Sequence, residues 1–259
     1  MGKIAIIGGT GVYDPSILNH LREVEQDTPY GKITAVEGEF HGKTVLFMNR
    51  HGAGHSIPPH MINYRANIRG LKELGVDRIL ATAAVGSVNR EMLPGDFVFI
   101  DQYLEFTKQR ACTFFDGGEM GVVHTDMTEP YCPEIRKAFD SAAKKIFHRA
   151  HNGGTYVCCE GPRFETPAEI KMYHLLGGDV VGMTGYPEVA LAKELGICYG
   201  TVAMVTNCAA GISETPLCHQ EVLDVMAQLS EDIKKLLLLT IDALPETREC
   251  ACGNTAESM

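Results

Sequence analysis

Short apolar runs alternate with segments of helical periodicity along most of the chain. Apolar runs that end in turn residues predict buried strands at 3–7, 78–83, 97–101, 155–159, 180–183 and 198–205, and two runs around His41-Gly42 predict a hairpin of 33–39 and 44–48. Apolar positions at helical spacing predict helices at 62–74, 133–147, 167–176, 187–195 and 219–244. This alternation predicts an α/β fold with a central mixed, mostly parallel β-sheet flanked by helices on both faces.

One domain accounts for most of the chain. Its 259 residues suffice for one large core, and no repeat, low-complexity run or linker divides them. We expect a single domain at 1–245, because Pro245 stops the last predicted helix. The residues that follow, 246–259, are polar and predict a tail that carries Cys250-Ala251-Cys252.

The charge balance narrows the classes of partner. The formal net charge is -10, which disfavours binding to a nucleic-acid backbone. No apolar run approaches the roughly 18 residues that a membrane span needs. Residues 1–7 run straight into turn glycines and lack the form of a signal peptide. We therefore expect a cytoplasmic protein that binds neither nucleic acid nor membrane.

The nine cysteines are scattered, without the paired C-x-x-C spacing of a structural zinc site. Cys132 has no activating base near it in the sequence and is interpreted as structural. Cys250 and Cys252 are interpreted as free thiols on an exposed tail, with a strained, reducible pair as the alternative. The cysteines in or beside apolar segments are expected to be small buried hydrophobes: Cys112, Cys158, Cys159, Cys198 and Cys208.

Two glycine-rich segments approach phosphate-binding motifs but depart from them. The segment 38–44 is one residue short of a P-loop and precedes a strand instead of opening a helix. After Gly9-Thr10-Gly11, Asp14 stands where a dinucleotide fingerprint needs glycine. A P-loop and a nicotinamide site are therefore disfavoured, and the chain has no G-x-S-x-G elbow of a serine hydrolase.

Three loops at predicted strand ends have groups that bind anions. The first is 9–11, where backbone amides and the Thr10 hydroxyl can hold one anion. The second combines the guanidinium of Arg50 with the imidazole of His51. The third, 81–87, is a run of small residues with hydroxyls. Together they predict a phosphate or oxyanion site at one edge of the sheet.

The turn at 160–166 is typical of a pocket for a flat, hydrogen-bonding ring. Gly161 and Pro162 form the turn, Phe164 offers an aromatic face, and Glu165 offers an acceptor. Asn207, at the end of another apolar run, offers both a donor and an acceptor. The alternatives are a surface loop with a half-buried Phe164 and an Asn207 that only caps a turn.

In this order, these blocks resemble the trimeric purine nucleoside phosphorylases, in the branch that includes 5'-methylthioadenosine phosphorylase. The resemblance runs nearly end to end and implies a nucleoside phosphorylase type I fold. Its motifs lie at 8–11, 50–52, 60–67, 84–87, 94–96, 129–133, 160–166, 181–184 and 187–188. The tail Cys250-Ala251-Cys252 is also similar to a Cys-x-Cys ending of heat-stable members, where it forms a redox-active pair.

The resemblance implies phosphorolysis of a purine ribonucleoside, with phosphate as co-substrate and no cofactor, no metal and no covalent intermediate. Arg50, His51 and Asn207 would be the catalytic residues. Met183 would line the ribose, Phe164 would stack on the base, and His124 would reach a neighbouring subunit's site. A homotrimer is implied, with a hexamer as the alternative. The residues implied to hold phosphate are Thr10, Arg50, His51, Thr82, Ala83 and Thr184.

Two positions depart from the methylthioadenosine pattern and favour 6-oxopurines. Glu165 stands where those enzymes have Ser, and Asn207 where they have Asp. A carboxylate at 165 can accept from the N1–H of a 6-oxopurine, whereas adenine would leave that buried charge unpaired. His219 matches the His that binds the ribose 5'-hydroxyl, although it could instead face solvent. Inosine or guanosine is favoured; 5'-methylthioinosine, methylthioadenosine phosphorolysis and a non-catalytic nucleoside sensor are the alternatives.

Overall fold

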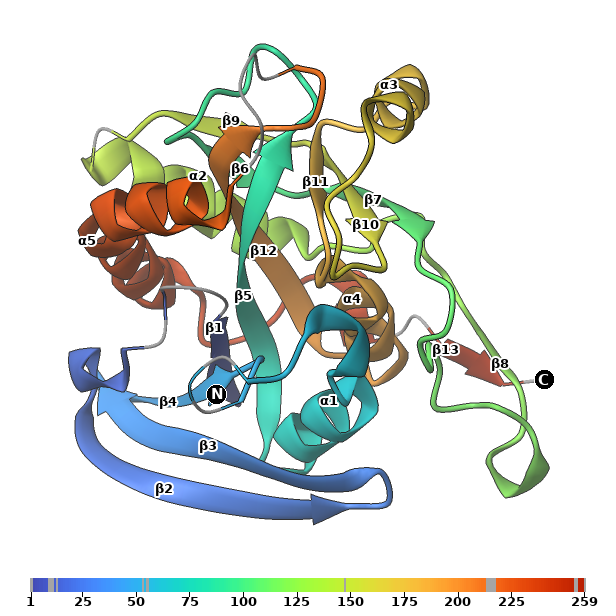
Figure 1. The fold of residues 1–259 in the computed structure, drawn as a ribbon. Coiled ribbons are helices and arrows are strands. Elements are labelled where there is room, and N and C mark those ends of the chain that lie inside the picture. Colours follow the sequence, from blue (N-terminus) through green and yellow to red (C-terminus); the bar gives the residue numbers. More distant parts are fainter. Residues whose placement is uncertain are drawn as a thin grey trace.

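A computed structural model gives the fold and describes residues 2–8, 12, 14–52, 54, 56–146, 148–212, 218–253 and 256–258, without the side chains of Glu119, His219 and 256–258 (Figure 1). The helices are α1 (Tyr64–Glu73), α2 (Pro133–Ile146), α3 (Pro167–Leu175), α4 (Gly185–Glu194) and α5 (His219–Ala243). The strands are β1 (Lys3–Gly8), β2 (Asn19–Thr28), β3 (Gly31–Phe40), β4 (Lys43–Asn49), β5 (Val76–Ser87), β6 (Phe97–Phe99), β7 (Gln102–Phe106), β8 (Val123–Thr125), β9 (Ala150–Asn152), β10 (Thr155–Cys159), β11 (Val180–Gly182), β12 (Cys198–Cys208) and β13 (Ala256–Ser258).

One large sheet forms the centre, in the order β2-β3-β4-β1-β5-β11-β10-β7, with β12 pairing β5 and β6. β1, β4, β5 and β12 run parallel to one another where they pair, whereas β11 meets β5 in the antiparallel sense. The predicted mixed, mostly parallel sheet is confirmed. Figure 1 shows β5 and β12 crossing the middle of the molecule, while β8 and β13 project to one side as a separate small sheet.

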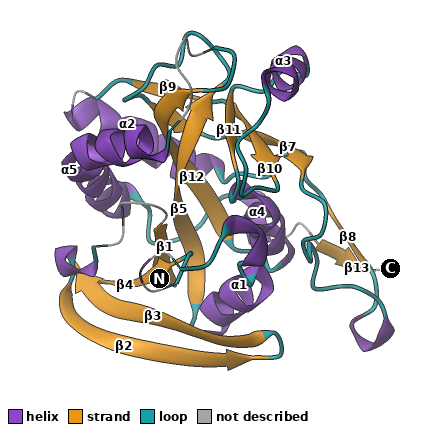
Figure 2. Ribbon diagram, in the orientation of Figure 1, coloured by secondary structure: helices purple, strands orange, loops and turns teal. Residues whose placement is uncertain are grey.

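Helices cover both faces of this sheet, which explains why residues 4–7 of β1 are all apolar (Figure 2). Ile4 and Ile6 pack in one hydrophobic cluster with residues of α2 and α5, whereas Ala5 and Ile7 pack in another with residues of α1 and α4. All four side chains are 0% exposed. Successive residues of a strand point to opposite faces of the sheet. In a strand with helices on both faces, neither set of side chains therefore faces the solvent.

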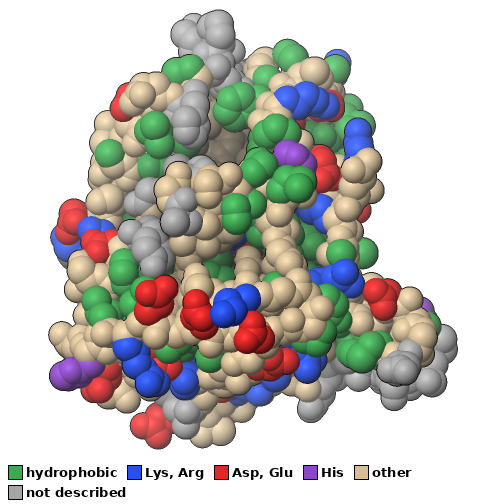
Figure 3. Space-filling view, turned by 60° about the horizontal axis from the view of Figure 1, so that its bottom comes forward, with side chains coloured by type: hydrophobic (Ala, Val, Ile, Leu, Met, Phe, Trp, Pro, Cys, Tyr) green, Lys and Arg blue, Asp and Glu red, His purple; other side chains and the backbone are tan. Residues whose placement is uncertain are grey.

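The edge hairpin of β2 and β3 differs from this core. β2 is mostly exposed and polar, so it has no apolar run, and the sequence did not predict it. Its pairing with β3 and ion pairs such as Lys32–Glu25 and Arg22–Glu37 hold it in place. Figure 3 shows acidic and basic side chains interspersed on the face that it draws. This pattern differs from the continuous basic surface typical of nucleic-acid-binding proteins.

The C-terminal segment corrects one prediction. We expected an exposed tail after residue 245, but Cys252 is only 4% exposed and packs in the cluster with α2 and α5. Cys112 differs in the opposite direction, since it is exposed and not buried. Cys132, which was interpreted as structural, is buried. Among the described helices, none is long and apolar enough to cross a membrane.

Candidate active site

A cavity of about 230 Å³ opens where the central sheet divides. On one edge, β5 pairs with β1 as far as Ala81 and with β11 from Gly86, so residues 82–85 have no partner there among the described strands. The ends of β4, β11 and β12 converge on the same opening. The lining residues are Arg50, His51, Pro59, Ala83, Ala84, Val85, Gly86, Pro162, Phe164, Glu165, Val181, Gly182, Met183, Thr184, Thr206, Asn207, Ala209 and Val222.

Arg50 lies directly after β4 and is held from behind by a buried ion pair. Its Nε and Nη2 donate to the two carboxylate oxygens of Glu188, each at 2.7 Å, and its Nη1 donates to the Thr82 carbonyl at 2.9 Å. Tyr199 donates its hydroxyl to the same carboxylate at 2.7 Å. Burial alone would lower the pKa of Arg50, but the Glu188 charge outweighs it and holds the pKa above its usual value.

This ion pair leaves part of the guanidinium for the cavity. A guanidinium has five N–H donors in one plane, and Glu188 and Thr82 engage three of those of Arg50. The fork is therefore fixed in direction and still charged when it meets the opening. An oxyanion is the ligand that such a group binds best.

His51 follows Arg50 and is 5% exposed. Its Nδ1 lies 2.9 Å from the carbonyl oxygen of Ile57. Because a carbonyl only accepts, that nitrogen carries a proton, and the tautomer of the neutral ring is set. The ring is thereby oriented at the same end of the cavity as Arg50.

The turn after β11 supplies Met183 and Thr184. The backbone N–H of Thr184 donates to the hydroxyl of Tyr156 at 3.2 Å. This turn packs so closely on Tyr156 that a Cβ at Gly182 would lie 2.1 Å from its hydroxyl oxygen. Thr184 directly precedes α4, whose backbone is non-helical at Tyr186, so the regular helix begins only after that residue.

The predicted turn at 160–166 supplies Pro162, Phe164 and Glu165 to the lining of the cavity. Gly161 has a φ of +70°, and a Cβ there would lie 2.6 Å from the sulfur of Met183, so only glycine allows this approach. Phe164 lines the cavity and is 42% exposed, so its ring is not covered by the rest of the chain. Arg163, by contrast, pairs with Glu169 on the surface and does not line the cavity.

Glu165 is half-buried beside Phe164. Burial raises the pKa of its carboxyl group above the usual value, and hydrogen bonds from its own backbone and from the Cys159 thiol only partly offset this effect. A buried carboxylate is stabilised by a hydrogen-bond donor that takes the place of the water removed by burial. The cavity thus presents an acceptor next to an aromatic face.

A bulge in β12 directs Asn207 into the cavity. Val205 pairs with Val85 and Asn207 with Gly86, so Thr206 is the extra residue. The Thr206 hydroxyl has one proton to share between Asn207 Oδ1 at 2.9 Å and the Val85 carbonyl at 3.1 Å, and Asn207 Nδ2 donates to the Cys208 carbonyl at 3.0 Å. These bonds fix the orientation of the amide and leave one further donor on Nδ2.

The structure thus brings together most of the predicted site residues. The predicted site residues that line the cavity are Arg50, His51, Ala83, Phe164, Glu165, Met183, Thr184 and Asn207. Thr82 lies behind the lining, where its carbonyl accepts from Arg50.

His124, a further predicted site residue, does not line this cavity. His124 lies on β8, in the small sheet that projects away from it (Figure 1). Thr10 and the side chain of His219 lie outside the described residues.

Four residues with supporting roles were not predicted: Glu188, Tyr199, Tyr156 and Thr206. Glu188 lies in the motif 187–188, one of those on which the family resemblance rests, so the sequence did contain a signal for this residue. Tyr199 and Tyr156 lie within apolar runs, where the sequence pattern predicts a tyrosine of the hydrophobic core. Their roles depend on contacts between distant parts of the chain.

Comparison with known proteins agrees with this geometry. Residues 3–242 match the phosphorylase superfamily. The 6-oxopurine nucleoside phosphorylase of Pyrococcus furiosus is 56% identical over 257 residues, which cover 97% of each chain. The S-methyl-5'-thioadenosine phosphorylase of Pyrococcus horikoshii is 47% identical over 261 residues, 100% of this chain and 99% of its own. A solved methylthioadenosine phosphorylase from an antarctic soil metagenomic library has a TM-score of 0.91 at 36% identity, covering 98% of this chain and 90% of its own.

Proposed function

This chain belongs to the phosphorylase superfamily, and we propose that within it the protein is a purine nucleoside phosphorylase specific for 6-oxopurines. It cleaves the N-glycosidic bond of inosine or guanosine with phosphate and yields the free base and ribose 1-phosphate, a reaction of purine salvage. One observation carries the proposal: the Arg50 fork, Glu165 and Asn207 line a single cavity, with Arg50 bonded to the Thr82 carbonyl and Asn207 paired with Gly86 further along β5.

Phosphate binds at the end formed by Arg50, His51 and Thr184, with the Ala83 backbone as a further contact. The buried Arg50–Glu188 pair supports this assignment, because it keeps the guanidinium charged and fixed in direction. Of the other residues assigned to phosphate, Thr82 acts through its contact with Arg50, and Thr10 is assigned from the resemblance alone.

The purine binds at the other end. Its ring stacks on Phe164, its N1–H donates to Glu165, and the Asn207 amide donates towards N7 and O6. Adenine would place a lone pair at N1 and an amino group at C6, which leaves the carboxylate without a donor at N1. Sites built on such hydrogen bonds discriminate by about 10⁴ or more.

Charge development explains how these two ends promote the reaction. Breaking the glycosidic bond makes the ribose positive and the departing purine negative. Phosphate, held beneath the ribose that lies on Met183, favours the positive charge, and the Asn207 donor at N7 favours the negative charge. The side chains act by position and charge, so the catalytic cavity needs no organic cofactor, metal ion or covalent intermediate.

The residues assigned to the 5' position of the ribose are compatible with a second candidate substrate. His219 is proposed to bind the 5'-hydroxyl of inosine or guanosine. Val222, one helical turn later on α5, lines the cavity and offers an apolar surface. A 5'-methylthio group would suit that surface, and the P. horikoshii relative is named for a methylthionucleoside. The second candidate is therefore 5'-methylthioinosine, and the third is methylthioadenosine.

The proposed assembly is a homotrimer in the cytoplasm, with a hexamer as the alternative. β8 projects from the body of the chain, and His124 on it would then enter the cavity of a neighbouring subunit. Light scattering after gel filtration should give a mass of three or six times 28.3 kDa. A monomer at working concentration would overturn this assembly.

One assay tests the proposed function. Purified protein is given phosphate with inosine, guanosine, 5'-methylthioinosine, adenosine or methylthioadenosine in parallel, and release of the free base is measured. We expect turnover of 6-oxopurine nucleosides that requires phosphate. Preference for either 6-aminopurine nucleoside would contradict the specificity. Nucleoside binding without phosphate-dependent release would indicate a non-catalytic sensor.

A further inference from the structure

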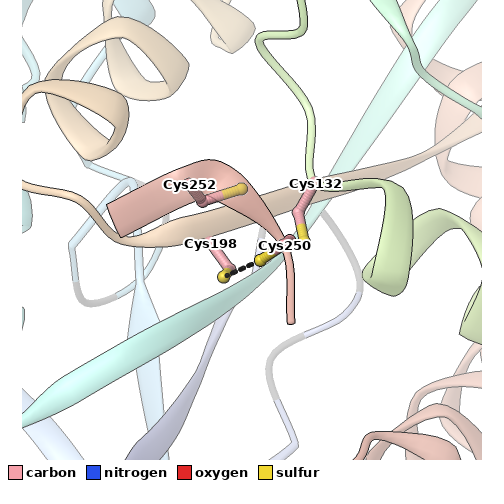
Figure 4. Close-up of side chains that lie close together, drawn as sticks. All are labelled: Cys132, Cys198, Cys250 and Cys252. Carbon is pink, nitrogen blue, oxygen red and sulfur yellow. Dashed lines mark hydrogen bonds between the residues drawn. The ribbon is translucent and has the colours of Figure 1, made fainter. Parts of the chain in front are cut away.

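Four cysteines that lie far apart in the sequence meet at one point of the fold (Figure 4). Cys132 directly precedes α2, Cys198 begins β12, and Cys250 and Cys252 come from the C-terminal segment around the short helix η5 (Ala251–Gly253). Their sulfur atoms all lie within 4.8 Å of one another. We call these four residues the thiol cluster; none of them lines the cavity described above.

We propose that the thiol cluster is a metal site that binds one zinc ion through four cysteine thiolates. A donor set of four sulfur atoms suits zinc, which prefers tetrahedral coordination by thiolates. A zinc–sulfur distance of about 2.3 Å places the sulfur atoms of a tetrahedron about 3.8 Å apart. The present separations fall on either side of that value, with 3.3 Å between Cys198 and Cys250 and 4.8 Å as the upper limit.

The burial of its members distinguishes the thiol cluster from a chance group of surface thiols. Cys132, Cys198 and Cys252 are buried, and Cys250 is half-buried. The three buried residues keep water from the ion, and Cys250 gives it a path of entry. The two cysteines of the C-terminal segment are one residue apart, so that one short turn supplies half of the ligands.

The surroundings already hold the ligands in place. Cys132 donates its backbone N–H to the Tyr199 carbonyl at 2.8 Å, which keeps it beside Cys198. On the other side, the Glu249 N–H donates to the Glu134 carboxylate at 2.7 Å and fastens the C-terminal segment to α2. Little rearrangement is therefore needed to bring the four sulfur atoms around an ion.

Arg248 supplies charge that a zinc–thiolate centre needs. Four thiolates and one Zn²⁺ carry a net charge of −2, which is costly to bury without a cation. The Arg248 guanidinium donates to the Gly196 carbonyl at 2.9 Å and lies 3.7 Å from the Cys198 sulfur. It is thus positioned to donate to a metal-bound sulfur and to offset part of that charge.

The binding step exchanges four S–H bonds for four S–Zn bonds. The four thiol protons pass to the solvent, and no electron is transferred, so the step needs no oxidant or reductant. The competing chemistry, two disulfides, would remove four electrons and would need an oxidant. The two outcomes therefore differ in metal content, in mass and in thiol count.

The test uses the full-length protein, reduced, stripped of metal and kept free of oxygen. Co²⁺ is added as a spectroscopic probe, followed by Zn²⁺. We expect saturation at one Co²⁺ per chain, with the visible bands of tetrahedral cobalt and sulfur-to-cobalt charge transfer in the near ultraviolet. Zn²⁺ should displace the cobalt and raise the melting temperature, while inosine phosphorolysis stays unchanged. Absence of these cobalt bands in the reduced protein would overturn the proposal.

Single substitutions locate the site. Cys250→Ser and Cys132→Ser should each weaken cobalt binding at least tenfold, whereas Cys112→Ser, at an exposed cysteine outside the cluster, should leave it unchanged. Because Cys250 is half-buried, its variant carries the test if Cys132→Ser does not fold. Equal binding by wild type and Cys250→Ser would exclude the thiol cluster. An intact mass four hydrogens lower, without metal uptake after reduction, would assign disulfides instead.

Discussion

Glu188 holds Arg50 through two parallel hydrogen bonds of 2.7 Å, although 138 residues separate them. Their side chains are 0% and 2% exposed. The pair places a fixed positive charge where the sheet divides. α4, which carries Glu188, therefore sets the direction of a cavity residue that directly follows β4.

Glu188→Gln should weaken both the fold and phosphate binding. A neutral amide can accept from only one arm of the guanidinium and leaves the buried charge without its partner, a change that costs about 3–5 kcal/mol of stability. We expect a lower melting temperature and a rise of about tenfold in the KM for phosphate. Glu194→Gln, on the same helix but bonded to the Phe114 N–H, is the control and should keep the phosphate KM. An unchanged phosphate KM in Glu188→Gln would mean that Arg50 needs no such support.

Glu165→Ser combined with Asn207→Asp should shift the preference towards 6-aminopurines. The double change removes the acceptor for N1–H and places a carboxyl group near N7 and the C6 substituent. We expect the kcat/KM ratio of methylthioadenosine to inosine to rise about a hundredfold or more. The matched control is Glu23→Ser with Asn19→Asp, both exposed on β2. A constant ratio would place the selectivity elsewhere in the cavity.

The pH dependence of inosine cleavage should report on Glu165. Burial raises its pKa, so kcat/KM should fall as pH drops through a value above the usual 4.5 of a glutamate, because only the carboxylate accepts from N1–H. Glu165→Gln should remove this limb of the profile. If the limb persisted, another group would be responsible.

The same shift predicts the sign of a stability effect. The native state binds its Glu165 proton more tightly than the unfolded chain, so stability falls as pH rises from the unfolded pKa to the raised folded one. Thermal denaturation across this range should show a weaker dependence on pH in Glu165→Gln than in the wild type.

Phe164→Leu should weaken nucleoside binding and spare phosphate binding. Phe164 lines the cavity and is partly exposed, and stacking of a base on an aromatic side chain contributes about 1–3 kcal/mol. We expect the KM for inosine to rise about tenfold. Phe115→Leu, at a partly buried phenylalanine outside the cavity, should show no such rise. Equal effects of the two variants on inosine would contradict stacking at Phe164.

Thr206→Val should lower activity through Asn207. The substitution keeps the shape of the side chain but removes the hydroxyl shared by Asn207 Oδ1 and the Val85 carbonyl, so the amide loses one of the two bonds that orient it. We expect a kcat for inosine reduced about tenfold with an unchanged KM for phosphate, measured by base release. Thr201→Val, at a buried threonine of the same strand, is the control. A kcat equal to that of the control would show that Asn207 needs no orienting bond.

Secondary structure was predictable where one physical effect dominates. The buried strands and long helices follow from apolar periodicity, and β10, predicted at 155–159, has those bounds in the structure. The hairpin of β3 and β4 was visible at His41-Gly42, whose φ values of 47° and 76° suit a tight turn. β2, β7, β8, β9 and β13 were not predicted. Short or polar strands gain stability from their partners and not from their own sequence pattern.

The same distinction between local and long-range effects applies to the residues of the candidate site. Arg50, Glu165 and Asn207 could be named from the sequence, because side-chain chemistry at strand ends and turns is a local property. Glu188, Thr206 and the thiol cluster could not be assigned in this way. Their roles depend on distances between distant segments, and the C-terminal segment was even expected to be exposed.

The sequence by itself determined the family, the α/β class and the chemical groups that a 6-oxopurine and a phosphate would meet. Only the tertiary structure decided that Arg50 is held by Glu188, that a bulge at Thr206 aims Asn207, and that four cysteines meet. The physical reason is that composition and periodicity act over a few residues. Charge pairing, hydrogen-bond direction and metal coordination act between atoms that only folding brings within a few ångströms.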